Sequence, residues 1–208
     1  FNVKYIYRIL EPDINQNHTP FEKEIKEVDI ISFKYEDGKC DAETLLVDPI
    51  TNDIFILSKR ENEIKIYILH YPQITSEIIT AKLVGKYDFY PEFENFEIGR
   101  ISGGDISNDG NELLIKSYIN VFYFNRIENQ SINETIINNK PLLVNYDFEP
   151  QGEAICWHNE GFGYFTLSEE KNNIPAHLYF YPRLEGCMDN SAINYNPYAS
   201  IPIRNCKY

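Results

Sequence analysis

The stretch DAETLLVDPITNDIFILSK, residues 41–59, decides the fold that we expect for this chain. An apolar strand over residues 42–47 leads into a turn rich in Asp, Asn and Pro, and a second apolar strand over residues 54–59 runs back. Two apolar segments joined by such a turn are typical of a β-hairpin. The pattern recurs as GGDISNDGNELLIKSY at residues 103–118 and as QGEAICWHNEGFGYFTLSE at residues 151–169. This internal repeat indicates a fold built from equivalent hairpins.

Further strands flank each hairpin. A third strand is expected after each one, over residues 64–69, 121–124 and 177–181, and a candidate outer strand before each one, over residues 28–35, 78–89 and 142–148. Four strands in about 40–50 residues is the period of a β-propeller blade. Residues 3–8 are interpreted as the last strands of a preceding blade. The sequence therefore predicts an all-β fold: a β-propeller with about three four-stranded blades plus part of another, and a ring that is incomplete because propellers need at least about four blades.

The composition agrees with strands and excludes two classes of partner. Among 208 residues there are 16 Tyr and 13 Phe but only six Ala, which disfavours helices and favours strands. The net charge of −13 opposes binding to nucleic acid and to anionic membrane surfaces, because both depend on Lys and Arg. No apolar run approaches the roughly 18 residues that a membrane span needs.

The four cysteines lack a CxxC pair, which opposes a zinc site. Cys187 and Cys206 bracket a short tail rich in Asn and Pro, and we expect a disulfide between them. Cys40 and Cys156 are bonded to each other, paired elsewhere or free, and for Cys156 a buried core thiol is favoured.

Three N-glycosylation sequons point to the same compartment as the disulfide. They begin at Asn17, Asn129 and Asn133, and the last two are expected in one polar loop. We therefore expect a secreted, extracellular glycoprotein that carries N-linked glycans.

Two parts of the chain resemble known families. The three repeat segments and YIYRILEPD, residues 5–13, are similar to a family of secreted bacterial-type β-propellers of largely unassigned function, which is loosely similar to calcium-dependent lactonase and esterase propellers. The tail GCMDNSAINYNPYASIPIRNCKY, residues 186–208, resembles Cys-bracketed GCxDxxAxNYxPxA-type repeats near the C-termini of secreted proteins. In place of the acidic stretch of those repeats the tail has IPIRN, which argues against a calcium role there. We expect a propeller portion over residues 1–184 and a Cys-bracketed module over residues 185–208.

Three acids, Glu43, Asp105 and Glu153, open the first strand of the hairpins when the repeat is aligned by sequence. The first strand of a blade lines the central channel, so these carboxylates should converge at one mouth. Such carboxylates can hold Ca²⁺, and the resemblance to lactonase-like propellers implies a metal that polarises a substrate carbonyl. The favoured interpretation is structural instead. The returning strands bring Lys59 and Lys116 beside the acids as ion-pair partners.

We assign no catalytic residue from the sequence, because His158 has no partner at a telling spacing and the GxSxG pattern is absent. The expected function is that of a non-enzymatic structural or binding module within a larger secreted glycoprotein assembly, such as a filament or a surface layer. Its partners would be other copies of itself, or another chain, that complete the propeller. The alternative is a calcium-dependent lactonase-like or esterase-like hydrolase with acids at the channel mouth.

Overall fold

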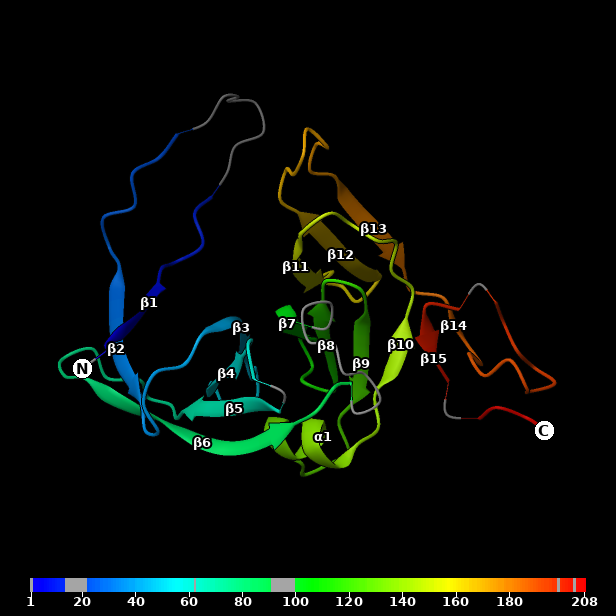
Figure 1. Cartoon of the computed structure of the whole chain (residues 1–208), viewed down its shortest axis with the longest axis horizontal. Coiled ribbons are helices and arrows are strands. Elements are labelled where there is room, and N and C mark those ends of the chain that lie inside the picture. The colour runs from blue at the N-terminus through cyan, green and yellow to red at the C-terminus, as the bar shows by residue number, and fades with distance from the viewer. Residues whose placement is uncertain (1, 14–21, 62, 91–99, 198, 204) are drawn as a thin grey trace.

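The computed structural model describes residues 2–13, 22–61, 63–90, 100–197, 199–203 and 205–208. This part of the chain has an all-β fold, as predicted, with three large sheets, one small sheet and one short helix (Figure 1). The sequon at Asn17 lies outside the described residues. No helix among them is long and apolar enough to cross a membrane.

The first sheet has the strand order β1-β2-β6-β5-β4-β3. Its strands are β1 (Lys4–Arg8), β2 (Asp29–Tyr35), β3 (Ala42–Val47), β4 (Ile54–Ser58), β5 (Ile64–Leu69) and β6 (Ile79–Tyr87). Strands β3 to β6 pair antiparallel in sequence order, whereas β2 pairs with β6 in parallel. That parallel pairing curls the β1–β2 hairpin over one face of the sheet, where Ile31 and Phe33 pack in one cluster with Ile54 and Leu69. Residues 4–8, which are interpreted from the sequence as the last strands of a preceding blade, form an edge strand of the first sheet.

The second and third sheets repeat the antiparallel plan. The second has the order β10-β9-β8-β7 and the third β11-β12-β13. Their strands are β7 (Ile101–Ile106), β8 (Glu112–Ser117), β9 (Val121–Asn125), β10 (Leu142–Val144), β11 (Gly152–Trp157), β12 (Gly163–Ser168) and β13 (Leu178–Pro182). The predicted hairpins are β3–β4, β7–β8 and β11–β12. The outer strands β6 and β10 follow their hairpins, so the prediction that outer strands precede them is wrong. Strand β6 pairs with β5 and β10 pairs with β9, so each outer strand adds to the sheet of the strand that it follows in the chain.

The first strands of the three hairpins lie close together, with β7 between β3 and β11. A Cβ on Gly104 would lie 2.9 Å from Leu46 Cδ2, and one on Gly103 would lie 2.6 Å from the carbonyl oxygen of Glu153. Only glycine therefore permits this approach on both sides of β7. One apolar core fills the space between the first and second sheets and another lies between the second and third. Sheets that meet at their first strands and pack face to face give the fold a propeller-like arrangement.

Helix α1 (Ile132–Asn138) follows β9 and packs Ile132 and Ile136 into the first of these cores. Ser131 and Glu134 form a capping box, which starts the helix by satisfying free N–H groups at its N-terminus. The expectation that Asn129 and Asn133 share a polar loop is therefore corrected. Asn129 is exposed just before the helix, but Asn133 lies within its first turn.

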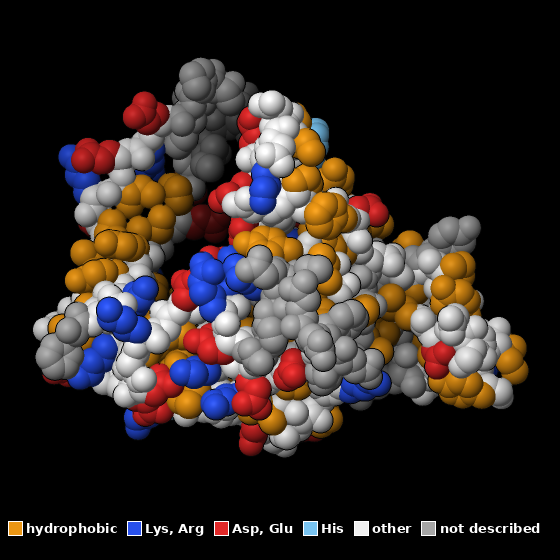
Figure 2. All heavy atoms as spheres, viewed as in Figure 1, with side chains coloured by type: hydrophobic (Ala, Val, Ile, Leu, Met, Phe, Trp, Pro, Cys, Tyr) orange, Lys and Arg blue, Asp and Glu red, His pale blue; other side chains and the backbone are white. Residues whose placement is uncertain are grey.

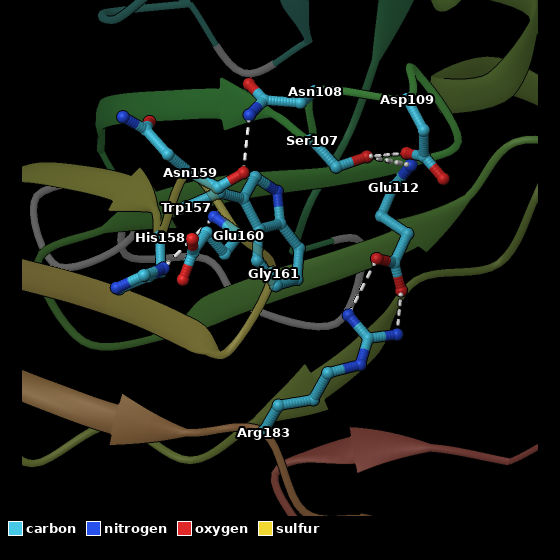
Figure 3. Close-up of a pocket in the computed structure, with 10 residues that line it drawn as sticks. All are labelled: Ser107, Asn108, Asp109, Glu112, Trp157, His158, Asn159, Glu160, Gly161 and Arg183. Atoms are coloured by element: carbon cyan, nitrogen blue, oxygen red, sulfur yellow. Dashed lines mark hydrogen bonds and ion pairs between the residues drawn. The ribbon is translucent and has the colours of Figure 1, made fainter.

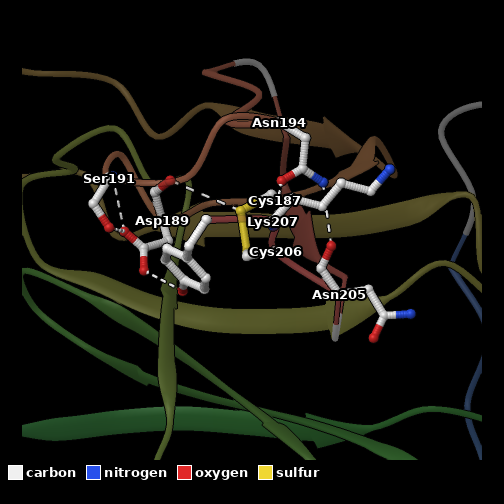
Figure 4. The surroundings of a disulfide bond; sticks show 8 residues. Cys187, Asp189, Ser191, Asn194, Asn205, Cys206 and Lys207 are labelled. Carbon is white, nitrogen blue, oxygen red and sulfur yellow. Dashed lines mark hydrogen bonds between the residues drawn. A yellow bond between two sulfur atoms is a disulfide. The ribbon is translucent and has the colours of Figure 1, made fainter.

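The C-terminal tail carries the predicted disulfide between Cys187 and Cys206. Figure 4 shows Asp189 beside this bond, where it accepts hydrogen bonds from Ser191. Asp189 also accepts a hydrogen bond from the hydroxyl of Tyr208. Two short parallel strands, β14 (Glu185–Gly186) and β15 (Ile201–Pro202), hold the start of the tail to its later part. Ile201 is buried in the core between the second and third sheets, so the tail is packed against the body of the molecule.

Candidate functional site

A β-bulge lies at the same place in each hairpin and fixes how the three repeats correspond. The strand register shifts between Ala42 and Thr44, between Ile101 and Gly103, and between Gly152 and Ala154. The bulged residues are therefore Glu43, Ser102 and Glu153, and these three are equivalent. Asp105 lies three residues farther along its strand, at the position of Leu46 and Cys156.

This register corrects the predicted alignment of Asp105 with Glu43 and Glu153. The sequence alignment matches Gly104-Asp105 to the small residue and acid of the other two repeats, although the acid has been replaced by Ser102 in this one. A better signal is present in the returning strands, each of which ends in a buried serine: Ser58, Ser117 and Ser168. Aligning these serines gives the register that the structure has.

A chain of polar contacts links the bulges of the first and third hairpins. Lys59 forms an ion pair with Glu43, and its Nζ lies 2.8 Å from the hydroxyl oxygen of Tyr118. The Tyr118 hydroxyl in turn donates to Glu153 Oε1 at 3.0 Å. Burial opposes the charged form of Lys59, but its bonds to Glu43 and Tyr118 raise its pKa above the usual value. Lys59 therefore stays protonated and joins the hairpins electrostatically.

Lys116 does not pair with Asp105 as predicted. It lies opposite Gly103 in the register, two residues from Asp105, and its side chain is fully buried between the second and third sheets. Its Nζ donates to Tyr146 Oη at 2.9 Å and to the carbonyl oxygen of Gly152 at 2.8 Å. Burial lowers the pKa of Lys116 to about 8, against the opposing effect of nearby carboxylates.

Glu149 is the carboxylate nearest to this buried lysine. Its Oε2 lies 3.9 Å from Lys116 Nζ, it accepts a hydrogen bond from Thr166, and it is 2% exposed. A Cβ on Gly152 would overlap the side-chain ends of Lys116 and Glu149, so any larger residue there would displace this pair. The group forms a buried polar cluster at the contact of the second and third sheets.

Asp105 also contributes to this contact, because its Oδ2 accepts the backbone N–H of Trp157 at 2.7 Å. Burial raises its pKa. Among the described residues, no three His, Cys, Asp or Glu side chains are grouped so that they could hold a metal ion. A Ca²⁺ site at Glu43, Asp105 and Glu153, and hydrolase chemistry there, stay predictions from the sequence.

A second group of polar residues surrounds a cavity of about 390 Å³ at the turns of the second and third sheets (Figure 3). Arg183 donates two hydrogen bonds to Glu112, at 2.8 and 2.9 Å, and lies over the ring of Trp157. Asn108 donates to the carbonyl oxygen of Asn159 at 2.6 Å and so joins one turn to the other. These contacts bind the two sheets together from the turn side.

The outer face of the third sheet differs from the equivalent faces of the other two. By register, the face positions in the first sheet are Leu46, Phe55, Leu57, Ile66 and Ile68, all buried against the second sheet. In the second sheet they are Asp105, Leu114, Lys116, Val121 and Tyr123, which face the third sheet. In the third sheet they are Cys156, Phe165, Leu167, Leu178 and Phe180.

No described sheet covers this last face. Leu178 is 67% exposed, Phe180 is 45% exposed, and Cys156 is an exposed free thiol. The expectation of a buried Cys156 is therefore wrong, because its strand belongs to the sheet whose outer face is open. Cys40 is the buried free cysteine, and burial raises its pKa to about 11.

Comparisons with known proteins identify no family for this chain. No protein-family model matches the chain, and no curated protein does. The solved structure of TolB from Acinetobacter baumannii, a β-propeller, is similar over 74% of this chain and 34% of its own, with 12% identity and a TM-score of 0.43. A complex of KlAtg21 with the coiled coil of AgAtg16 is similar over 67% of this chain and 38% of that chain, with 12% identity and a TM-score of 0.38. The chain thus spans little more than a third of either solved chain, and TM-scores this low support no functional argument.

The class of protein is defined by the strands and their register. The chain is an all-β protein with propeller-like antiparallel sheets and a disulfide-bonded tail.

Proposed function

We propose that this chain is a non-enzymatic structural or binding module of a larger secreted glycoprotein assembly, in which a further β-sheet from another copy or another chain completes a β-propeller. The observation that carries the proposal is the open outer face of the third sheet. Its positions Leu167, Leu178 and Phe180 correspond to residues that are buried under a neighbouring sheet in both preceding sheets.

An apolar sheet face of this kind is a binding surface by its chemistry. Monomeric soluble proteins rarely expose large contiguous apolar patches, and those that do use them for association. Leu167, Leu178 and Phe180 are neighbours on one face, in cross-strand register. A covering sheet would remove their apolar surface from water, at about 25 cal/mol per Å² buried.

The polar groups at the strand starts also favour a structural role. Glu43 is engaged by Lys59, Glu153 by Tyr118, and Asp105 by the backbone of Trp157. Each of these contacts joins one hairpin to another or closes a hairpin on itself. The acids are therefore engaged in contacts that hold the hairpins together.

The secreted, glycosylated character rests on two further observations. The disulfide at Cys187 and Cys206 is typical of oxidising compartments. Asn129 is exposed, with a positive φ of 66°, so a glycan there would extend into solvent. The sequon at Asn133 needs the hydroxyl of Thr135, which is fully buried, whereas Ser131, which the sequon at Asn129 needs, is partly exposed. We expect the glycan at Asn129.

Alkylation of Cys156 in native secreted material tests the proposal. The thiol lies on the open face, whereas Cys40 is buried and serves as an internal control for unfolding. In the assembly Cys156 should react at least tenfold more slowly than in chains dissociated by the substitution Leu178→Glu, as measured by mass spectrometry of its peptide. Equal reactivity in the native material and in the Leu178→Glu chain would overturn the proposal.

A further inference from the structure

An apolar groove separates β1 and β3, the two edge strands of the first sheet. It has a volume of about 400 Å³ and is lined by apolar side chains that include Ile6, Ile31, Leu45, Val47 and Ile54. A second hollow of about 260 Å³ shares Ile6 and Leu45 with it and extends the groove along both strands. Leu45 is 41% exposed and Val47 48% exposed. The groove therefore offers an apolar floor beside the unpaired main-chain edge of β1.

The third sheet has one strand fewer than the other two blade-like units, so the edge of β13 is open to a further strand. Strands β3–β6 and β7–β10 form four-stranded antiparallel units, but only β11–β13 are present in the third sheet of the described chain. The N–H of Arg183 donates to the carbonyl oxygen of Phe162 at 2.7 Å, so it points towards β12. Because N–H groups alternate sides along a strand, the N–H of Phe180 points away from β12 to the free edge. A fourth strand would pair there.

We infer that β13 of a second copy of this chain lies in the groove and pairs along β1. This inference rests on the proposed function and names the partner. Both strands have five residues, and every neighbouring pair inside the three blade-like units is antiparallel, so β13 would run antiparallel to β1. The incoming sheet would gain the fourth strand that it lacks, and β1 would gain a partner on its free edge.

The side chains that would meet in this arrangement occupy positions equivalent to those that meet between sheets within one chain. By register, Val47 is equivalent to Ile106 and Trp157, which each face the preceding sheet. Leu178 and Phe180 are equivalent to residues that face the following sheet. Docking would place the third sheet of one copy before the first sheet of the next. The new contact therefore continues the two sheet contacts that the chain already has.

The number of described sheets fits a dimer of this chain. Propellers typically close with four to eight blades. Three blade-like sheets are described here, so two such copies would place about six in one ring, which lies within that range. The contact is head-to-tail, and two such contacts close a ring. Figure 1 shows β1–β2 and β11–β13 on opposite sides of the open part of the molecule, and Figure 2 shows hydrophobic side chains gathered at both places.

The first experiment measures the mass of the purified chain by light scattering over a range of concentrations. We expect twice the 24.4 kDa of a single chain, and tighter association in higher salt because each copy carries a net charge of −13. A single-chain mass at all concentrations and salt levels would overturn the inference. If Cys156 is nevertheless protected in native material, another chain supplies the missing sheet and the proposed function stands.

Two variants of one residue test the strand pairing itself. Phe180→Pro removes both the side chain and the N–H that points to the free edge, and proline is tolerated at such edge positions. Phe180→Ala removes the side chain and keeps the N–H. The dimer dissociation constant should rise at least tenfold more for Phe180→Pro than for Phe180→Ala. Equal effects in chains with unchanged circular dichroism would show that no main-chain pairing forms at this edge.

A mixing experiment tests the head-to-tail geometry. Val47→Glu damages the groove and Leu178→Glu damages the incoming sheet, so each variant alone should be monomeric. In an equimolar mixture, one of the two contacts in a ring is intact, and dimers containing one chain of each kind should form. If Val47→Glu leaves the dimer unchanged, the copies meet face to face through the third sheet and the inference is wrong.

Discussion

The contact between the first and second sheets is apolar, whereas the contact between the second and third is built around buried polar groups. Leu46 and Leu57 face the second sheet, and their equivalents in the next contact are Asp105 and Lys116. Both contacts have the same strand register and the same bulge. The comparison teaches that register fixes where the sheets meet, while the side chains at the contact decide whether packing or hydrogen bonding holds them.

The largest effect is expected from breaking the polar contact at Glu149. In Glu149→Ala, the buried Lys116 loses its nearest carboxylate and Thr166 loses its acceptor. Removing one member of a buried ion pair costs about 3–5 kcal/mol, because the remaining charge stays buried and unpaired. Urea denaturation should show a loss of this size in the free energy of unfolding.

The matched control is a double substitution that makes the contact between the second and third sheets resemble the apolar contact between the first and second. Lys116→Leu combined with Glu149→Gln places at the second contact the leucine that the first contact has at Leu57. Replacing a buried ion pair by groups of similar volume is often neutral, so most of the stability should return. A loss below about 1 kcal/mol for Glu149→Ala alone would contradict a contact that depends on this ion pair.

The next largest effect is a difference in the stability cost of truncating equivalent leucines, one in a covered sheet and one in the open sheet. Leu57 is fully buried, and Leu57→Ala should cost about 2–5 kcal/mol. Leu167, at the same position of the third sheet, is 39% exposed. In chains kept monomeric by Val47→Glu, which leaves the third sheet intact, Leu167→Ala should cost less than about 1 kcal/mol in thermal or urea unfolding. Similar costs at both positions would mean that the third sheet is covered within a single chain.

The pH dependence of stability should separate the two contacts as well. The pKa of Lys116 is lowered to about 8 in the folded chain, below its usual value of 10.5. Between these values the unfolded chain binds more protons, so this group makes stability rise with pH, by about 1.4 kcal/mol per pH unit. Below pH 8 both states are protonated, and the cost of the buried charge is fully present.

The measurement is the difference in unfolding free energy between the wild type and Lys116→Met. This difference cancels the effect of Cys40, whose raised pKa makes stability fall as pH rises through the alkaline range. From pH 8 to pH 9.5 the wild type should gain about 2 kcal/mol relative to the variant. A constant difference would mean that Lys116 does not change its protonation in this window.

The hairpins are predictable from the sequence because their signals are local. Alternating apolar residues and a turn rich in Asn, Asp and Gly need no knowledge of what lies across the strand. The bulges are not predictable in this way, since they appear only when two strands are paired. This is why the sequence alignment places Asp105 with Glu43 and Glu153. That alignment shifts the second repeat by three residues, and the shift is detected only when Ser117 is matched to Ser58.

The surroundings of Lys116 are harder still to predict. A lysine in a strand is usually exposed, and its partners Tyr146 and Glu149 come from the segment after β10, outside the repeat. Helix α1 is a different case. The capping-box residues Ser131 and Glu134 stand in the sequence three residues apart and predict a helix start, although the composition as a whole argues for strands.

The smallest expected effect concerns Ser102, the residue that replaces an acid at the bulge of the second hairpin. Its hydroxyl donates to the carbonyl oxygen of Gly152 at 2.9 Å and joins the second sheet to the third. Ser102→Ala should cost about 1 kcal/mol in urea unfolding, the usual net value of one hydrogen bond, because the Gly152 carbonyl keeps Lys116 as a donor. Ser191→Ala in the exposed tail is the control and should cost less. If Ser102→Ala costs nothing, the polar contact depends on the Lys116 cluster and the Asp105 bond to Trp157 alone.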